Sequence, residues 1–539
     1  MTFARLTIAC KNSGCRWRLH ASCIEGGPKC QIKKNREEHK CGGTQHLGNK
    51  EVSSKWLAET TLEKFKDHPT YTPKELIGDV RREKGVTISY RVAWKAKESA
   101  HAQIHGDHVF AYQNLRNYCQ NILEANPGSV AHVQETIEGR FLRIFIAYNA
   151  SINGFMHCRP IIGLDGTHLK GKYLGILLTA TTIDAQGALF PIAFGVVIAE
   201  NDDNWCWFLQ SLKDVLRHTD PLTFISDRQK GLVDGVMLVF GNDSSHGYCM
   251  RHLSDNFRKA FKSTQLLGML WKAADATNTQ DFDVIIGEIR TLNSNAAEWL
   301  RSIADPSHWA TCKFSGKRFG HLTSNIAESL NAWLLEARAM PILGMMELIR
   351  QKIMSWFYER RVNGETSKAR IGLVNGEITH DALVGYAEKF IRESIQRGGR
   401  LYRILPSTND VFEIHTPKHV RIVYVDKKIC TCGQWQDMGL PCAHAAAAIL
   451  FRKERVQSFA HKAYLLQSYC DTYKEPIFPV VVTHDNFVPG MLPPATRRPP
   501  GRPKTKRIRT IEEGTKKKEH RCGRCRGKGH NARSCRAPI

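Results

Sequence analysis

The chain has 539 residues, of which 42% are hydrophobic and 24% charged, so it is long enough for roughly three or four domains with buried cores. Its formal net charge of +25 favours a polyanionic partner, most often nucleic acid. The most apolar window, residues 188–199, is too short to span a bilayer, and the first residues lack a secretory signal. We therefore expect a soluble, intracellular protein with no membrane partner, whose 17 cysteines do not form disulfides.

The first cluster of cysteines falls in residues 1–48, which we interpret as an N-terminal zinc finger. Its candidate ligands are Cys10, Cys15, His39 and Cys41. Three thiolates and one imidazole complete a closed tetrahedral Zn²⁺ site. The long gap before the histidine leaves Cys23 and Cys30 as alternative ligands. The order C-x4-C…H-x-C resembles the WRKY/GCM-like finger that opens many plant transposase-derived proteins.

Residues 51–135 are polar and have a helical pattern. Thr72 is a good N-cap with Pro73 directly after it, Gly85 ends that helix, and Ser89 begins a second one. An Asn-Pro-Gly-Ser turn closes the segment. Two helices joined by a short turn that contains glycine suit a DNA-binding helix-turn-helix, and they suit an ordinary α-hairpin equally well.

From residue 141 onward the hydrophobic period changes to that of strands. Four strand-like runs, separated by Gly, Asn and Asp turns, are FLRIFIAYN, RPIIGLDGT, LGILLTATTID and LFPIAFGVVIAE. An amphipathic helix over 203–218, a strand within 222–231 and a long helical stretch over about 251–305 follow them. We interpret residues 141–360 as an α/β domain with a helical insertion.

Three acidic residues in this domain are candidate catalytic or metal-binding residues. Asp165 lies in a run that otherwise suits a buried sheet, where a charge is costly unless it is paired or holds a metal. Asp227 lies at the end of the strand within 222–231. Glu328 lies in a predicted helix over 321–338, on the polar face, where a solvent-facing glutamate is unremarkable in any helix. The opposite, apolar face of that helix consists of Ile326, Leu330, Trp333, Leu334 and Ala337.

A second Cys/His cluster lies in a predicted module over residues 400–460, and its candidate ligands are Cys430, Cys432, Cys442 and His444. The run 419–430 alternates like a strand, and 443–453 is a good helix. Two ligands would come from the strand end and two from the helix start, which is a ββα zinc fold. The pattern C-x-C…C-x-H resembles the SWIM zinc finger, and the sequence leaves open whether this finger binds DNA or protein.

About half of the basic excess lies at the end of the chain, where Thr496–Arg536 holds 16 Lys and Arg against 3 Asp and Glu. A basic linker over 490–520 contains RRPPGRPKTKRIR, whose Gly-Arg-Pro core is like an AT-hook of the A·T minor groove. We favour nuclear localisation as its main role, with minor-groove contact as a second use and a plain solubilising tail as the alternative. The candidate DNA-binding residues are Arg497, Arg498, Arg502, Lys504, Lys506 and Arg507.

The last predicted module, residues 521–539, has the spacing of a CCHC zinc knuckle. Its ligands would be Cys522, Cys525, His530 and Cys535. Glycines between the ligands let so short a loop fold round one ion, and arginines and lysines surround it. Such knuckles bind single-stranded nucleic acid.

The motifs IIGLDGTHLKG, FISDRQKG, YCMRH and TSNIAESLN together resemble a Mutator-like (MULE) DDE transposase, and the flanking fingers agree with that architecture. The resemblance implies an RNase H-like mixed sheet with a helical insertion, in which Asp165, Asp227 and Glu328 are catalytic. It also matches Cys249 and His252 to the family's C-x2-H motif, which would assist substrate placement or bind metal.

The chemistry that the resemblance implies is DNA recombination: water cuts a phosphodiester and the freed 3′ hydroxyl joins target DNA. It needs two divalent ions, Mg²⁺ or Mn²⁺, about 3.5–4 Å apart. Asp165 would bridge both ions, while Asp227 and Glu328 would each hold one. The implied partners are terminal inverted repeats and target DNA in a plant nucleus, with the chain acting as a homo-oligomer.

Two other functions fit parts of the sequence. The first is a domesticated descendant that binds regulatory DNA sites as a transcription regulator without catalysis, because a catalytic triad can outlive its activity. The second is an RNA-binding knuckle protein, which rests on residues 522–535 alone and leaves the three carboxylates unexplained. Whether the chain is an enzyme is therefore open at this stage, with the transposase favoured.

Overall fold

The computed structural model describes residues 5–10, 14–23, 30–36, 52–68, 71–105, 107–217, 220–228, 230–303, 305–335, 337–371, 382–417, 419–481 and 490–495. Met1–Arg497 form one unit, and the second unit, Arg498–Ile539, contains no described residue. The predicted knuckle ligands and the basic-run residues from Arg497 onward therefore lie outside the described residues. Among the helices in those ranges, none has both the length and the apolar character that a membrane span requires.

A three-stranded antiparallel sheet lies near the N-terminus, in the order β1-β2-β3. Its strands are β1 (Arg5–Ala9), β2 (Arg18–Cys23) and β3 (Cys30–Arg36). Cys10 and Cys15 lie in the connection between β1 and β2, where the Cys10 amide donates to the Trp17 carbonyl at 3.0 Å. His39 and Cys41 lie outside the described residues, so the zinc site of this finger remains a prediction.

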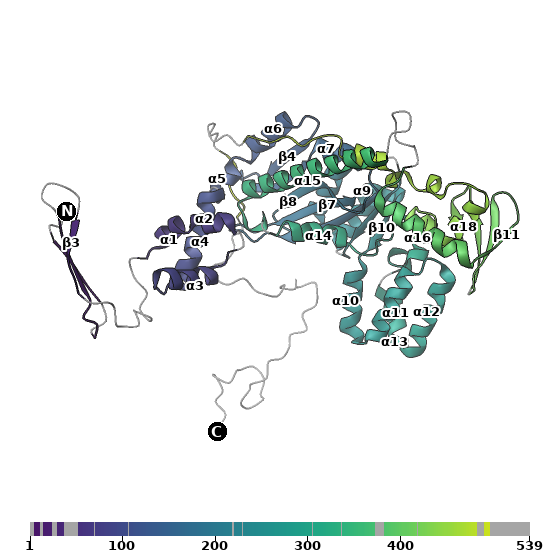
Figure 1. Ribbon diagram of the computed structural model, residues 1–539, viewed down its shortest axis with the longest axis horizontal. Helices are drawn as coiled ribbons and strands as arrows, with labels where there is room; N and C mark the ends of the chain where they lie inside the picture. Colours follow the sequence, from purple (N-terminus) through teal and green to yellow (C-terminus); the bar gives the residue numbers. More distant parts are fainter. Residues whose placement is uncertain are drawn as a thin grey trace, which may run out of the picture. The chain divides into compact units, whose positions relative to one another are not determined.

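Four helices with a small core of their own follow. They are α1 (Ser54–Thr60), α2 (Leu62–Asp67), α3 (Pro73–Lys84) and α4 (Tyr90–His105) (Figure 1). The predicted start of α3 is confirmed, because Thr72 and Glu75 form a reciprocal capping box. Gly85 ends α3 in the left-handed region at φ +64°, and the Ser89 hydroxyl accepts from an amide in the first turn of α4.

A seven-stranded mixed sheet forms the centre of the chain, in the order β10-β9-β6-β7-β8-β5-β4. Its strands are β4 (Val130–Glu135), β5 (Phe141–Ala147), β6 (Ile161–His168), β7 (Ile176–Ile183), β8 (Leu189–Val197), β9 (Leu222–Ser226) and β10 (Ser244–Tyr248). The strands from β4 to β8 pair antiparallel, whereas β9 and β10 run parallel to β6. The five strands predicted from the sequence are all present in this sheet.

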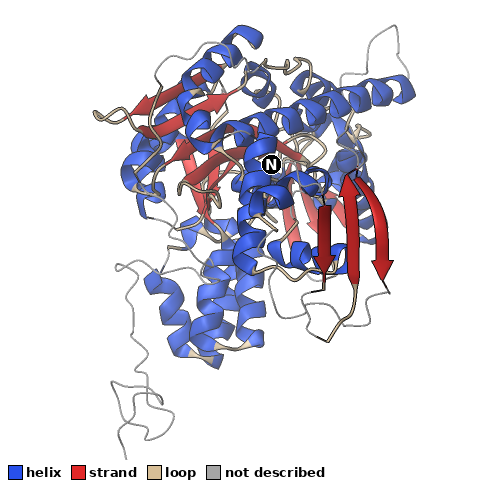
Figure 2. Ribbon diagram, turned by 90° about the vertical axis from the view of Figure 1, so that its left-hand side faces the viewer, coloured by secondary structure: helices blue, strands red, loops and turns tan. Residues whose placement is uncertain are grey.

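Helices lie on both sides of this sheet (Figure 2), and every residue of β7 is buried. They are α5 (His108–Gln113), α6 (Leu115–Ala125), α7 (Asn149–Phe155), α8 (Asp202–Val215), α9 (Lys230–Phe240), α14 (Asn325–Trp333) and α15 (Ile342–Ile371). Burial on both faces explains why the strand runs read as nearly continuous apolar sequence rather than as an alternation.

The predicted limit of the helical segment at residue 135 was wrong. Residues 130–135 form strand β4, which pairs with β5 at the edge of the central sheet, and α6 packs on the same core. The sequence VAHVQE is half polar because only one side of this edge strand faces the core, so its strand character was easy to miss.

The predicted helical insertion is present and has a separate hydrophobic core. It consists of α10 (Met250–Phe261), α11 (Thr264–Asp275), α12 (Thr279–Leu292) and α13 (Ser294–Ile303), which lie together in Figure 1. The insertion begins directly after β10, so its first helix starts at the same edge of the sheet as the loop after β9.

The last described part of the chain surrounds the second Cys/His cluster. It contains α16 (Gly385–Leu401), β11 (Arg403–Pro406), β12 (Val411–His415), β13 (Val420–Tyr424), β14 (Ile429–Cys430), α17 (Gln434–Met438), α18 (Ala443–Phe451) and α19 (Leu466–Thr472). The run 419–430 is a hairpin rather than the single strand predicted, with Lys428 at φ +55° in the turn. Buried residues of this part belong to the same hydrophobic core as the central sheet.

Candidate active site and zinc centre

Asp165 lies inside the central sheet, directly after four buried residues of β6. The side-chain amide of Asn331 donates to its Oδ2 at 2.6 Å. Burial, together with the nearby charges of Asp227 and Glu328, raises the pKa of Asp165 to about 6, against the hydrogen bond from Asn331, which lowers it. The Asp165 carboxylate, whose charge we expected to be costly to bury, is therefore partly desolvated.

Asp227 comes directly after β9, the strand that runs parallel to β6. The register pairs Gly163 with Ile225, so two further residues along each strand bring Asp227 level with Asp165. Adjacent strands lie about 4.8 Å apart, and residues at the same level point to the same face. The parallel pairing of β6 and β9 thus explains how two acids 62 positions apart come to one edge of the sheet.

Glu328 is brought to this edge by α14, which crosses β6, β7 and β8. A Cβ atom at Gly163 would lie 3.4 Å from Ala327, so the glycine lets the helix approach the strand closely. The Glu328 side chain is 20% exposed, so it is not the solvent-facing glutamate that is ordinary in any helix, and it forms an ion pair with Arg251. The Ser324 hydroxyl lies 3.5 Å from its other carboxylate oxygen.

The helix that carries Glu328 is shorter than predicted, since α14 spans Asn325–Trp333 and not 321–338. Its predicted apolar face is nonetheless correct, because Ile326, Leu330 and Leu334 are buried. The helical wheel could not predict which elements lie opposite the polar face. These are the edge of the sheet and the first turn of α10.

The three predicted acids lie within electrostatic reach of one another. The charges of Asp227 and Glu328 both raise the pKa of Asp165, and both also raise the pKa of His252. The charges of Asp227 and Glu328 therefore act on both Asp165 and His252. Because such interactions weaken with distance, all four side chains belong to one small region. The structure therefore brings the three predicted acids together, and His252 of the predicted C-x2-H motif lies beside them.

Cys249 and His252 lie at the start of α10, beside that region. The Cys249 sulfur accepts the Ser324 amide at 3.2 Å and a hydrogen bond from His252. Burial raises the pKa of the Cys249 thiol, but these hydrogen bonds outweigh it and leave the pKa below its ordinary value. The same contact raises the pKa of His252 to about 9, so its imidazole is mostly protonated at neutral pH.

Two residues of this site were missed by the sequence analysis, Asn331 and Arg251. Asn331 is 6% exposed, and its Oδ1 has no hydrogen-bond partner although its amide binds Asp165. It follows Glu328 by three positions, so the helical period already placed both on one side of α14. Arg251 lies within the quoted motif YCMRH, but its pairing with Glu328 depends on the tertiary fold.

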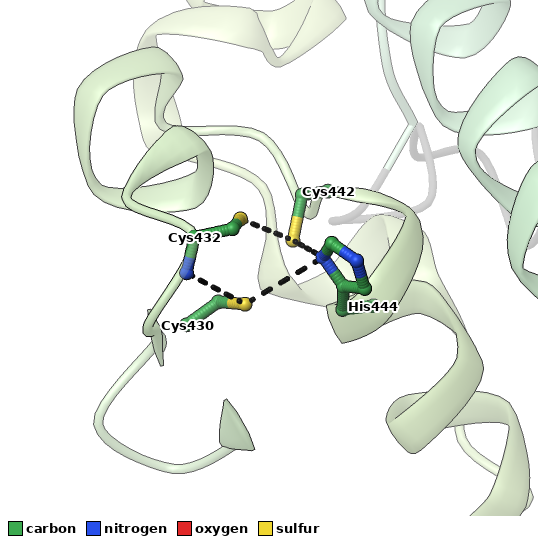
Figure 3. Close-up of side chains that lie close together, drawn as sticks. All are labelled: Cys430, Cys432, Cys442 and His444. Carbon is green, nitrogen blue, oxygen red and sulfur yellow. Dashed lines mark hydrogen bonds between the residues drawn. The ribbon is translucent and has the colours of Figure 1, made fainter. Parts of the chain in front are cut away.

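The four ligands of the second cluster converge (Figure 3). Cys432 Sγ lies 3.5 Å from Cys442 Sγ, and His444 Nδ1 lies 3.8 Å from the sulfurs of both Cys430 and Cys442. Ligands at about 2.0–2.3 Å from a tetrahedral Zn²⁺ are separated by about 3.3–3.8 Å, so these positions fit one ion. As predicted, one pair comes from the end of β14 and the other from the start of α18.

The zinc cluster is joined to the central domain through α17. The carboxylate of Asp437 accepts the backbone amides of Arg318 at 2.8 Å and Gly320 at 3.2 Å, and burial raises its pKa. On the other side of the cluster, the Thr277 hydroxyl donates to the Cys432 carbonyl at 2.6 Å. The loop at 318–320 leads within a few residues into α14, so this contact connects the zinc ligands to the helix of Glu328.

These features define a class: a mixed-sheet domain with converging acids, a helical insertion and a C-x-C…C-x-H zinc finger. Residues 161–256 match the MULE transposase domain family, and residues 422–453 match the SWIM zinc finger family. The chain therefore carries a MULE transposase domain and a zinc-binding SWIM finger.

A relative from Arabidopsis thaliana, "Protein FAR1-RELATED SEQUENCE 6", is 25% identical over 201 residues. The matched region covers 34% of this chain and 28% of that protein, so the chain spans little more than a quarter of its relative's length. The likeness agrees with a MULE-related family.

Proposed function

We propose that this protein is a MULE-type transposase that binds DNA, cuts it in the presence of Mg²⁺ and joins the ends to target DNA. The observation that carries the proposal is the convergence of Asp165, Asp227 and Glu328 at one edge of the sheet. The strand arrangement supports it, since the order β8-β7-β6-β9-β10 with β9 and β10 parallel to β6 is that of an RNase H-like core.

The residues at this edge suit a pair of Mg²⁺ ions. Carboxylate and amide oxygens are the hard ligands that Mg²⁺ takes in proteins, and three carboxylates converge here. The buried Asn331 Oδ1, which has no partner within the described residues, adds a fourth oxygen at the same place. When bound, Mg²⁺ supplies the activation of the attacking oxygen and the stabilisation of the leaving oxygen.

The role of the chain's own residues is to hold the metal ions and to orient the carboxylates that bind them. Asp165, fixed by β6 and by the Asn331 amide, would hold both ions, and Asp227 and Glu328 would each hold one. Asn331 keeps the Asp165 carboxylate in one orientation. Because Asp165 is partly desolvated, its ionised form gains most when a cation is bound beside it.

The experiment that tests the proposal is a nicking assay with the full-length protein and supercoiled DNA that carries the terminal inverted repeats. Strand cleavage should require Mg²⁺ or Mn²⁺, should stop with a chelator, and should resume when the divalent ion is restored. A protein that binds this DNA but never nicks it, at any Mg²⁺ concentration, would contradict the enzyme.

A second function, a DNA-binding transcription regulator without catalysis, is favoured by the surroundings of Glu328. One of its oxygens is paired with Arg251 and the other lies near the Ser324 hydroxyl, so both have partners within the protein. In such a regulator the triad would persist as an ion-paired structural feature. The nicking assay separates the two functions, because a regulator binds its sites and leaves the strands intact.

DNA is the partner in both cases, and the four-helix segment offers a surface for it. Arg81, Arg82 and Lys84 are exposed at the end of α3, and Arg91 and Trp94 are exposed on α4. A basic surface with an aromatic ring suits phosphate and groove contacts, as expected of a helix-turn-helix. The basic tail suits a nuclear protein, and the family resemblance favours a homo-oligomer that acts on paired ends.

Cleavage is expected to fall as the pH is lowered through about 6. The raised pKa of Asp165 means that its carboxylate is fully formed only above that pH, and a protonated carboxyl does not hold the metal. More Mg²⁺ should move the midpoint to lower pH, because the ion competes with the proton. Initial nicking rates between about pH 5 and 8 at two Mg²⁺ concentrations measure this. A flat profile below pH 7 would contradict it.

Deleting residues 496–539 is expected to weaken non-specific DNA binding and to flatten its salt dependence. Each lost phosphate contact lowers the slope of log K against log salt by about 0.9 for duplex DNA. Binding isotherms at several salt concentrations give the slope. The matched control is Cys522→Ser, which removes a predicted zinc ligand and keeps the tail's positive charge, so it should retain most of the slope. An unchanged slope in the deletion variant would contradict the tail's role.

A further inference from the structure

The side chains of Cys249, His252 and Glu328 form a cluster that the proposed Mg²⁺ pair does not explain. One ligand atom from each lies within 4.8 Å of the others. Cys249 is buried, while His252 is exposed at the surface, so the cluster is open to ions from solution. Apart from the SWIM ligands, it is the one cluster of this kind found in the described residues.

The distances between ligand atoms in the cluster of Cys249, His252 and Glu328 can be compared with those in the SWIM finger of the same chain. Its four ligand atoms satisfy the same 4.8 Å limit. Its Cys430 and Cys442 sulfurs accept backbone amides at 3.5 Å, as thiolates that bind zinc commonly do, and the Cys249 sulfur accepts the Ser324 amide at 3.2 Å. The Cys249 sulfur is therefore oriented by a backbone amide in the same manner as the sulfurs of a zinc-binding module.

The donor set selects the metal. A thiolate, an imidazole and a carboxylate are ligands for Zn²⁺ and similar transition metals, whereas Mg²⁺ avoids sulfur. Three protein ligands leave a fourth position open, which is the arrangement of an exchangeable or reactive zinc rather than of a closed structural one. We propose that Cys249, His252 and Glu328 bind one Zn²⁺, and that this ion competes with the catalytic Mg²⁺ for Glu328.

The competition follows from the position of Glu328. Its carboxylate lies within 4.8 Å of ligand atoms of Cys249 and His252, while Asn331, three residues further along α14, donates to Asp165 at 2.6 Å. A carboxylate drawn to zinc at α10 is not available in the same orientation to Mg²⁺ at β6. Zinc should therefore lower Mg²⁺-dependent cleavage, and excess Mg²⁺ should weaken zinc binding. This second part rests on the proposed transposase activity, whereas the zinc site itself does not.

The site is tested by counting zinc in the full-length protein after equilibrium dialysis against Zn²⁺. Wild type should hold one more ion per chain than Cys249→Ser. His252→Ala should lose the same ion, and since this side chain is exposed, the variant avoids a change in the core. Glu328→Gln should weaken that ion's affinity by at least about tenfold, because even loss of an outer hydrogen-bond partner of a ligand costs that much. Cys312→Ser, which changes a half-buried cysteine packed against the core of the insertion, is the matched control and should keep the full count.

Cobalt gives a second readout that does not depend on activity. Replacing Zn²⁺ by Co²⁺ should add a sulfur-to-metal absorption band in wild type that is missing from the Cys249→Ser difference spectrum and retained in Cys312→Ser. Equal metal content and equal spectra in wild type, Cys249→Ser and His252→Ala would overturn the site and leave only a hydrogen-bonded Cys249–His252 pair.

The competition has a separate test. Micromolar Zn²⁺ should slow wild-type nicking in Mg²⁺, and the slowing should be relieved by raising Mg²⁺. Each variant is compared with its own zinc-free rate, and His252→Ala should lose sensitivity to zinc. If zinc did not slow nicking by wild type, the proposed competition for Glu328 would be wrong. The zinc count would still show whether the zinc site exists. Complete absence of nicking would instead count against the proposed transposase alone.

Discussion

Asparagine in place of Asp165 is expected to reduce Mg²⁺-dependent strand cleavage by at least about a thousandfold while making the metal-free protein more stable at neutral pH. Losing a ligand of both ions removes several kcal/mol of transition-state stabilisation, and about 1.4 kcal/mol corresponds to each tenfold in rate. Asparagine keeps the size of the side chain and can still accept the Asn331 amide. DNA binding should be nearly unchanged.

The gain in stability follows from the pKa of Asp165. Burial raises it from 3.8 to about 6, so the folded state binds this proton more tightly than the unfolded state does. The carboxylate consequently lowers the free energy of unfolding as the pH rises from about 4 to about 6, and the full loss persists at pH 7. Removing the charge should recover about 2–3 kcal/mol.

Calorimetry with and without Mg²⁺ measures both effects. Mg²⁺ should raise the Tm of wild type and leave that of Asp165→Asn unchanged. The matched control is Asp184→Asn, another buried carboxyl whose pKa burial also raises, located after the far end of β7. This control should cleave DNA at close to the wild-type rate. Wild-type cleavage in Asp165→Asn would end the assignment.

Removing zinc from the SWIM finger is expected to destabilise the central domain as well as the finger. In the variant Cys442→Ser the finger loses a ligand that is fully buried. Zinc contributes roughly 10 kcal/mol or more to the folding of isolated zinc modules, so the local loss is large. Because Asp437 holds the loop before α14, cleavage should fall by at least about tenfold together with the Tm.

The measurements are the zinc content, the Tm and limited proteolysis of the full-length protein. Cys442→Ser should lack one zinc per chain and be cut within residues 403–451. Cys470→Ser alters a half-buried cysteine of α19 that is no zinc ligand, and it should behave as wild type. A Cys442→Ser protein with normal Tm and normal nicking would show that the finger and the central domain are energetically independent.

Much of the local structure could be predicted because its determinants are local. The Thr72 cap, the Gly85 stop and the strands β5 to β9 depend on short-range signals that are visible in the sequence. β4 and β10 were missed because VAHVQE and SSHGY lack a clear apolar pattern and rely on a partner strand. The same dependence on partners explains why the predicted limit at residue 135 failed.

The site was predictable as a set of residues but not as a set of contacts. The three acids were identified from their motifs, yet the half-buried state of Glu328 follows from how closely α14 approaches Gly163. The roles of Asn331 and Arg251 likewise depend on which element lies opposite α14. For the SWIM finger the spacing of ligands along the chain was sufficient, because all four lie within 15 residues of one another.

The shared core of the SWIM finger and the central sheet has a consequence for related proteins that lack the proposed transposase activity. Such a relative would still need the finger to keep its remaining domains folded, and selection for an intact protein would preserve its four ligands. Persistence of the C-x-C…C-x-H signature in such a lineage thus reports the integrity of the fold, and it says nothing about whether the finger reads DNA.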